Sequence, residues 1–305
     1  MKNIVSIKQF QDTELLEELF AQAAALKAMD PADYPKPLAN KVIATLFYEP
    51  STRTRMSFEA AITRMGGGLV STENAGQFSS AAKGETLQDT IRTLNGYVDG
   101  IVLRHPMLGA AQIAADYSDV PIVNAGDGAG EHPTQALLDL FTIKEAKGQL
   151  DGLKIGLVGD LLNGRTIHSL IHLLKMYKAD IYCIAPDELQ LPKSYQQELA
   201  ASHDKFHLLS SWDEVLPELD VLYITRIQKE RFEDLKTYNR VKDSFVFDGE
   251  ALKKLNKKAI IMHPLPRVNE ITPEVDNDRR ALYFEQARNG LFVRMALVAY
   301  LCNQE

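Results

Sequence analysis

The segment KVIATLFYEPSTRTRMSFEAA (residues 41–61) contains the pattern on which the fold prediction rests. Its first part, residues 41–48, is an almost unbroken apolar run without two-residue alternation, which is typical of a strand buried on both faces of a sheet. A helical pattern starts near residue 53, so the strand is expected to turn directly into a helix. A strand followed at once by a helix favours βαβ units and a parallel sheet.

The same alternation continues along the chain. Further apolar runs predict strands at 100–104, 121–125, 154–160, 180–185, 221–226 and 259–264, and amphipathic stretches predict helices near 53–65, 86–97, 107–117, 133–147, 165–177 and 191–201. We therefore expect an α/β protein with two doubly wound parallel-sheet domains and the active site in the cleft between them. Segment 144–154, with two glycines, is the expected hinge. The last helical run, 285–303, is expected to return to the first domain because its apolar face needs a partner.

The composition restricts the function classes. The chain has 305 residues, which suggests two domains, and its net charge is −7. Nucleic-acid-binding proteins usually have a basic surface, so no nucleic-acid partner is expected and an anion must be bound in a local basic pocket. We expect no signal peptide and no membrane span, because the apolar segments are too short. Cys183 and Cys302 lack metal-ligand spacing, so we expect no metal and a cytoplasmic location.

Polar clusters follow six of the expected strands. They are EPSTRTR (49–55), RHP (104–106), GDGAGEHPTQ (126–135), GDLLNGRT (159–166), TRIQKER (225–231) and HPLPR (263–267). Ligands of open α/β sheets bind outside the carboxyl ends of the strands. Clusters from both halves of the chain therefore predict one shared site.

Residues Ser51 to Arg55 predict an anion site. The start of a helix has unpaired N–H groups and a partial positive charge, and Arg53 adds a guanidinium there. Phosphate is the favoured anion, since it can use several N–H donors and a guanidinium together. The alternative is that Ser51 or Thr52 is only a helix cap, and Arg55 can be a structural ion-pair partner.

Two further groups of the first half could complete this site. Arg104 ends a strand, where an arginine alone is equally consistent with a solvated side chain. His132 precedes Pro133 at a probable helix start, where a neutral imidazole can donate to a developing oxyanion. Gln135 lies over the same helix entrance and would supply an amide to a neutral polar group.

The second half offers sites for carboxylates. Arg165 lies just inside a helix, and Arg226 and Gln228 project to the same side of an extended segment, with Arg231 behind them. The alternative for the last three is a charged loop. A nucleotide-dependent oxidoreductase is the rival enzyme class, but the turn GDLLNGRT lacks G-x-G-x-x-G spacing. A binding protein without activity is the third possibility.

The small-residue segment AGQFSSAAKGET (75–86) contains Ser79, Ser80 and Lys83. Its composition fits a mobile lid and a solvated surface loop equally well.

Taken in order, these segments resemble one family. STRTR, RHP, HPTQALLDLFTI, GDLLNGRTIHSL, TRIQKER and HPLPR occur in the order typical of the carbamoyltransferases, and the similarity extends over nearly the whole chain. HPLPR, RIQKER and AAKGET resemble the catalytic chains of the aspartate carbamoyltransferases in particular. Ornithine carbamoyltransferases typically have Cys at the position of Pro264, and a cationic amine would fit poorly beside Arg165 and Arg226.

The resemblance implies transfer of a carbamoyl group from carbamoyl phosphate to L-aspartate, an early step of pyrimidine synthesis, without a metal or other cofactor. Transfer to ornithine or another amine is the alternative. The implied carbamoyl-phosphate site consists of Ser51, Thr52, Arg53, Thr54, Arg104, His132, Gln135, Pro264 and Leu265. Thr54, Arg104 and His132 would polarise the carbonyl. The implied aspartate site consists of Lys83, Arg165, Arg226 and Gln228.

The resemblance also implies an assembly. Ser79 and Lys83 would reach the active site of a neighbouring subunit in a homotrimer, with Ser80 as the alternative serine. Glu49 would join the two domains in a closed form through Arg165 and Arg231. Residues 1–133 with 290–305 would bind carbamoyl phosphate, and residues 134–289 would bind aspartate. In some relatives two trimers associate with zinc-containing regulatory dimers, but this chain has no cluster of four Cys.

Overall fold

The computed structural model describes residues 2–128, 130–202, 206–232 and 234–302. The chain divides into two compact units, Met1–Leu138 with Arg288–Glu305, and Asp139–Ala287. The division passes through two helices, α6 (Pro133–Lys147) and α11 (Tyr283–Cys302). The expected domain bounds and the hinge at 144–154 stay predictions.

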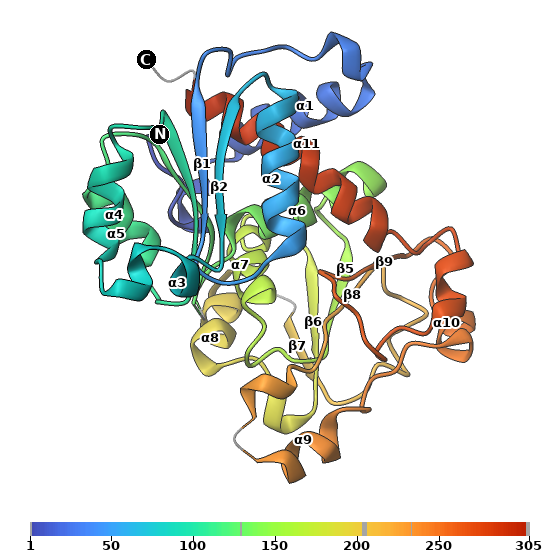
Figure 1. Ribbon diagram of the computed structural model, residues 1–305. Helices are drawn as coiled ribbons and strands as arrows, with labels where there is room; N and C mark the ends of the chain where they lie inside the picture. Colours follow the sequence, from blue (N-terminus) through green and yellow to red (C-terminus); the bar gives the residue numbers. More distant parts are fainter. Residues whose placement is uncertain (1, 129, 203–205, 233, 303–305) are drawn as a thin grey trace. The chain divides into compact units, whose positions relative to one another are not determined.

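The first unit contains a four-stranded parallel sheet in the order β2-β1-β3-β4. Its strands are β1 (Val42–Phe47), β2 (Gly68–Glu73), β3 (Gly100–His105) and β4 (Ile122–Asp127). Figure 1 shows α4 and α5 on one side of this sheet and α2 on the other. The helices of this unit are α1 (Thr13–Ala28), α2 (Thr52–Arg64), α3 (Ala75–Phe78), α4 (Leu87–Leu94) and α5 (Ala110–Asp116), with short 3-10 turns η1 (Ile7–Phe10), η2 (Pro31–Asp33) and η3 (Ser80–Lys83).

The second unit contains a five-stranded parallel sheet in the order β7-β6-β5-β8-β9. Its strands are β5 (Lys154–Val158), β6 (Asp180–Ile184), β7 (Phe206–Leu209), β8 (Val221–Ile224) and β9 (Ile260–Met262). Figure 1 shows α7 and α8 on one side of this sheet and α10 on the other. The helices are α7 (Arg165–Leu174), α8 (Lys193–Ser202), α9 (Leu235–Val241) and α10 (Gly249–Lys254), with turns η4 (Asp187–Leu189), η5 (Lys229–Arg231) and η6 (Pro273–Asn277).

Two parallel sheets with helices on both faces confirm the predicted fold class. Each strand predicted from the sequence is present, but β2 and β7 were not predicted. Both are edge strands, and only part of each is shielded from solvent. A strand that is not buried on both faces lacks the continuous apolar run from which the other strands were recognised.

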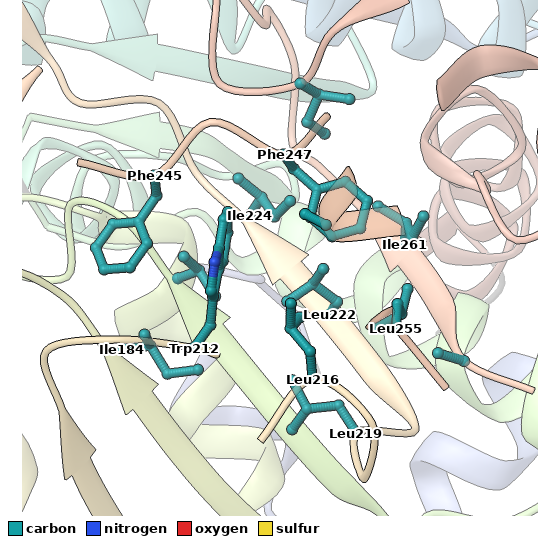
Figure 2. Close-up of a cluster of buried hydrophobic side chains, with 14 of the residues drawn as sticks. Ile184, Trp212, Leu216, Leu219, Leu222, Ile224, Phe245, Phe247, Leu255 and Ile261 are labelled. Carbon is teal, nitrogen blue, oxygen red and sulfur yellow. The ribbon is translucent and has the colours of Figure 1, made fainter. Parts of the chain in front are cut away.

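The apolar core of the second unit surrounds Trp212. Phe245 and Phe247 approach its ring edge-on, with centroids 5.1 and 5.7 Å away. Figure 2 shows these three rings among aliphatic side chains from β6, β8 and β9. This core supports β8 and β9, whose carboxyl ends lead into the polar segments 225–231 and 263–267.

Truncation of a ring in this core should destabilise the second unit. Phe247 is fully buried, so Phe247→Ala removes its contacts and leaves a cavity, and we expect the free energy of unfolding to fall by about 3–5 kcal/mol. Chemical denaturation would measure the change. The control is Leu235→Ala, whose side chain is 57% exposed and should cost no more than about 0.5 kcal/mol. An equal loss in both variants would contradict the assignment of this cluster as the core.

Candidate active site

The start of α2 forms an anion-binding geometry. Ser51 is its N-cap residue, but the Ser51 side chain makes no capping hydrogen bond. The first helical bond runs from Arg55 N–H to Ser51 O at 2.9 Å, so the N–H groups of the preceding turn have no partner within the helix. Thr54 is buried, whereas Thr52 and Arg53 are exposed. Ser51 is therefore the N-cap residue, as the alternative interpretation has it, but its side chain does not cap the helix.

Arg55 has a structural role instead. Its guanidinium lies 3.0 Å from the carboxylate of Glu59 and 3.0 Å from that of Glu73. Ser71 on β2 donates to the same Glu59 carboxylate at 2.5 Å. This network ties α2 to the edge strand β2, which confirms the interpretation of Arg55 as an ion-pair partner.

Arg104 and His132 are brought together at Gly126. Arg104 Nη1 donates to Ala125 O at 3.2 Å, and both side chains are buried, with 8% and 5% exposed. A Cβ atom on Gly126 would lie 2.9 Å from Nη1 of Arg104 and 3.6 Å from Cδ2 of His132. Because Gly126 has no side chain, a guanidinium and an imidazole can share this small space. The expected pairing of the two groups is thus present in the first unit.

Glu49 also lies in this cluster. Its Oε2 is 3.5 Å from Nη2 of Arg104. The neighbouring His105 packs against Tyr48 with ring centroids 4.4 Å apart. Burial lowers the pKa of His105, and the carboxylates of Glu49 and Asp127 partly oppose that effect. The site therefore holds a carboxylate beside the arginine that is expected to bind substrate.

Arg294 links the two helices that start at this site. It is buried in α11, and its Nη1 donates to Ser57 Oγ of α2 at 2.9 Å. Its Nη2 donates to Oγ1 of Thr134 in α6 at 3.3 Å. Thr134 lies between His132 and Gln135 in the sequence. In the sequence, Arg294 interrupts the apolar run GLFVRMALVAYLC (290–302). A charged residue inside such a run was the signal that it has a buried partner.

The two serines of the 75–86 segment are engaged within their own chain. Ser79 Oγ accepts from Ala81 N–H at 3.2 Å and donates to Ala75 O at 2.5 Å. Ser80 Oγ donates to Glu85 at 2.8 Å, whereas Lys83 is exposed. The segment is a compact turn of α3 and η3, so Lys83 is displayed at its surface.

In the second unit, the turn after β5 is built around Asp160. Gly159 has φ +112°, and a Cβ atom there would lie 2.4 Å from Thr225 O, so this glycine allows close packing against the end of β8. The Asp160 carboxylate accepts the Asn163 N–H at 2.9 Å and the Gln228 N–H at 3.4 Å. Burial raises the pKa of Asp160, and these hydrogen bonds oppose the effect. Asp160 therefore holds the turn and Gln228 in one arrangement, a role that the sequence analysis missed.

Gln228 and Arg165 are placed by this turn. Gln228 Nε2 donates to Asn163 O at 3.2 Å. Arg165 is the first residue of α7, and its N–H donates to the same Asn163 O at 3.0 Å. The half-buried Arg165 side chain thus emerges at a helix start, which favours a negatively charged ligand.

Arg226 is paired with an acidic side chain in this structure. Its guanidinium makes a two-point contact with Glu230, with N–O distances of 2.5 and 3.1 Å. This contact raises the pKa of Arg226, although burial acts against it. Arg226 and Glu270 also line one small pocket with Tyr238 of α9. The fork geometry of Arg226 is therefore suited to a carboxylate, as predicted, and Glu230 already occupies that geometry.

The HPLPR segment ends β9 in a tight turn. Leu265 has φ +49° and its N–H donates to Nδ1 of His263 at 2.8 Å. The other nitrogen of His263 lies 2.7 Å from the buried carboxylate of Glu270. The resemblance implies a role for Pro264 and Leu265, whereas no role was predicted for His263 or Glu270.

The structure thus brings the predicted residues together in two groups, each within its own unit. The first unit holds Ser51 to Thr54, Glu49, Arg104, His132 and Gln135 around the ends of β1, β3 and β4, and the second holds Arg165, Arg226, Gln228, Arg231, Pro264 and Leu265 around the ends of β5, β8 and β9. Within the described parts of the chain, no three His, Cys, Asp or Glu side chains gather as metal ligands would. The helices described are also too short or too polar to cross a membrane.

Comparisons with known proteins identify the family. Residues 2–145 match the model of the aspartate/ornithine carbamoyltransferase carbamoyl-P binding domain, and residues 151–301 match that of the Asp/Orn binding domain. The chain is 49% identical to a chloroplastic aspartate carbamoyltransferase of Oryza sativa over 98% of this chain and 84% of that protein.

Solved structures give the same result. The catalytic subunit of M. jannaschii aspartate transcarbamoylase is 47% identical, with a TM-score of 0.91 over 99% of this chain and 98% of that one. The Trypanosoma cruzi enzyme in complex with N-(phosphonacetyl)-L-aspartic acid is 42% identical, with a TM-score of 0.90 over 98% of this chain and 95% of that one. The chain belongs to the aspartate/ornithine carbamoyltransferase family, and the relatives it matches are aspartate carbamoyltransferases.

Proposed function

We propose that this protein transfers the carbamoyl group of carbamoyl phosphate to the α-amine of L-aspartate, giving N-carbamoyl-L-aspartate and phosphate. This reaction is an early step in the synthesis of pyrimidines. The observation that carries the proposal is the start of α2, where the Ser51 hydroxyl makes no capping bond and Arg53 stands beside unpaired N–H groups. Residues 2–145 match the carbamoyl-P binding domain of the family, so carbamoyl phosphate is the ligand that we propose for this anion site.

The phosphate group of carbamoyl phosphate would bind at the start of α2. Ser51, Thr52, Arg53 and Thr54 would supply hydroxyl, N–H and guanidinium donors, and Arg104 would add a second guanidinium. The carbonyl oxygen would then lie near Thr54, Arg104 and His132. Gln135 and the backbone at Pro264 and Leu265 would contact the carbamoyl amide. The location of Arg104 and His132 beside Gly126 supports this arrangement.

L-Aspartate would bind through its two carboxylates. Arg165 and Arg226 each carry a guanidinium at the end of a strand or the start of a helix, Gln228 is held beside them by Asp160 and Asn163, and Lys83 would come from another chain. A cationic acceptor such as ornithine would face the same arginines and be repelled. The charge of this group therefore favours aspartate over ornithine.

The chemistry follows from these charges. The uncharged amine attacks the carbonyl carbon, and negative charge develops on the oxygen, where Thr54, Arg104 and His132 donate. The tetrahedral intermediate collapses and expels phosphate, whose oxygens can take the proton lost by the amine. The protein contributes mainly by orienting two small anions, which can be worth roughly 7–11 kcal/mol.

Domain closure would bring the two groups into one site. Glu49 contacts Arg104 at 3.5 Å in this structure, and Arg226 is paired with Glu230. In the proposed closed form, Glu49 turns to Arg165 and Arg231, which leaves Arg104 to the substrate. Closure would also exclude water from the carbamoyl group.

A homotrimer would complete the site with Ser79 or Ser80 and Lys83 of a neighbouring chain. Two features of the first unit support it. The first four residues of the edge strand β2 are exposed, and an exposed edge strand offers unpaired backbone groups with which another chain can associate. Phe78, 79% exposed, lies in the same segment as Lys83. Association of two trimers with zinc-containing regulatory dimers stays a prediction from the resemblance. So does the cytoplasmic location, because the rice relative is chloroplastic.

The function is tested by incubating the protein with carbamoyl phosphate and either L-aspartate or ornithine. We expect carbamoyl aspartate and phosphate in equal amounts with aspartate, and no carbamoylated product with ornithine. Because an oxidoreductase was the rival class, NAD(P)H fluorescence serves as a second control and should not change. Faster turnover with ornithine would overturn the assignment of the acceptor.

Two neighbouring arginines should behave differently when replaced. Arg53→Ala removes a guanidinium donor to the phosphate, which gains negative charge as it leaves, so we expect kcat to fall by roughly 10²–10³-fold without loss of fold. Arg55→Met is the matched control, because Arg55 contacts Glu59 and Glu73. It should lower the midpoint of thermal unfolding and change kcat by less than about threefold. Steady-state kinetics and thermal melting measure both effects, and the reverse pattern would refute the assigned roles.

Mixed trimers would test the shared site. Lys83→Ala and Arg53→Ala should each be inactive, but a trimer with both kinds of chain contains one site with both native residues. Random reassembly of equal amounts should restore about a quarter of the wild-type activity, since three quarters of the trimers are mixed and each has one native site of three. Activity is measured after dissociation and reassembly. If the mixture remains inactive although mixed trimers are present, Lys83 does not act across subunits.

A further inference from the structure

A buried histidine and glutamate lie behind the turn that follows β9. His263 and Glu270 are 1% and 5% exposed, and Nε2 of His263 is 2.7 Å from Oε1 of Glu270. The other carboxylate oxygen, Oε2, accepts the N–H groups of Val268 and Asn269 at 3.0 and 3.1 Å. Thus one carboxylate fixes both the histidine ring and the far end of the turn.

The hydrogen bonds determine the protonation of His263. Its Nδ1 accepts the N–H of Leu265 at 2.8 Å, so Nδ1 carries no proton. The proton of a neutral imidazole must then be on Nε2, which donates to Glu270. Burial opposes ionisation of the Glu270 carboxyl, but the hydrogen bonds from His263 and Val268 hold its pKa below the usual value. His263 is therefore an oriented ring with an acceptor aimed at the backbone of Leu265.

The backbone of His263 is also held by hydrogen bonds. The backbone N–H of His263 donates to Oε1 of Gln286 at 2.9 Å, and Nε2 of Gln286 donates to the buried carboxylate of Asp139 at 2.6 Å. Asp139 also accepts from the hydroxyl of Tyr223 on β8 at 2.7 Å. The chain of bonds from Asp139 to Glu270 lies entirely in the second unit and leaves His263 little freedom to move.

We propose that His263, held by Glu270, is a positioning residue that sets the backbone of Pro264 and Leu265 for contact with the carbamoyl amide. This inference rests on the proposed function, which assigns that backbone to carbamoyl phosphate. His263 itself touches no substrate. It acts by holding the Leu265 N–H, which keeps Leu265 in its left-handed conformation (φ +49°) and directs the neighbouring carbonyl groups.

The same pair connects the turn to the expected aspartate site. Glu270 lines one pocket with Arg226 and Thr225, and its charge acts on Arg226. A shift of Glu270 would therefore change the surroundings of the arginine that is expected to hold aspartate. Errors of about 1 Å in the placement of reacting groups can cost 10²-fold in rate, so a small displacement of the turn should be measurable.

Two substitutions separate the two bonds of His263. The oxygen of His263→Asn can take the place of Nδ1 and accept from Leu265, but Asn is too short to reach Glu270. The amide of His263→Gln can reach Glu270 but places no acceptor at Leu265. The proposal assigns the positioning to the hydrogen bond from the Leu265 N–H to His263. We therefore expect His263→Gln to lose about 10- to 100-fold in kcat and His263→Asn to lose clearly less. The matched control is Arg280→Met, which removes hydrogen bonds to Leu252 and Leu255 away from the turn.

The measurements are kcat, KM for each substrate, the thermal midpoint and hydrogen exchange of the Leu265 amide in the full chain. We expect fast exchange in His263→Gln, slow exchange in wild type and His263→Asn, and a lowered midpoint with unchanged kcat in Arg280→Met. If His263→Gln does not fold, Glu270→Gln replaces it, because in either orientation its NH2 group faces a donor, the N–H groups of Val268 and Asn269 or the Nε2–H of His263. It should lower kcat and speed exchange in residues 265–270.

Unchanged kcat in His263→Gln, or a greater loss in His263→Asn than in His263→Gln, would overturn the proposal. So would a loss of kcat in Arg280→Met of the same size. If the wild-type chain carbamoylates no aspartate, the proposed function fails instead. Exchange of the Leu265 amide would still show whether His263 holds the turn, so the two failures are distinguishable.

Discussion

The unpaired N–H groups at the start of α2 are the constraint on which the site depends. The buried parallel strand β1 ends at Phe47, and α2 begins at Thr52. The Ser51 side chain does not cap the helix. The positive end of the helix therefore has the exposed Arg53 beside it, and an anion would satisfy both. The remaining features of the first unit serve this arrangement, since Arg294 joins α2 to α6 and Gly126 leaves room for Arg104 and His132.

The two units solve a common electrostatic problem in a similar way. An arginine side chain that binds a substrate anion must be held in place in the free protein, but its acidic partner must be able to leave when the anion binds. In the first unit Glu49 lies near Arg104 at 3.5 Å, and in the second Glu230 holds Arg226 by two contacts. In both contacts the carboxylate partner is partly exposed, 35% for Glu49 and 56% for Glu230, so water can solvate it when a substrate anion takes its place. Arg55, by contrast, is held by two carboxylates and serves the fold.

The sequence predicted the parts of this protein that depend on local patterns. Continuous apolar runs indicated the central strands, and polar clusters at their ends indicated the site. The edge strands β2 and β7 lack such runs and were missed. His263 and Glu270 were also missed, because their roles arise from a turn that brings them within 2.7 Å. Ser51 is the N-cap residue, but the absence of a side-chain capping bond could not be predicted, since cap geometry depends on backbone angles that residue types do not determine.

The most direct test of the account is a crystal structure of the protein with carbamoyl phosphate bound. The account predicts the phosphate oxygens within hydrogen-bond distance of the backbone N–H groups of Thr52 to Thr54 and of the Arg53 guanidinium. The carbonyl oxygen should then point toward Thr54, Arg104 and His132. A phosphate bound at Arg165 or Arg226 instead, with the start of α2 occupied only by water, would contradict it.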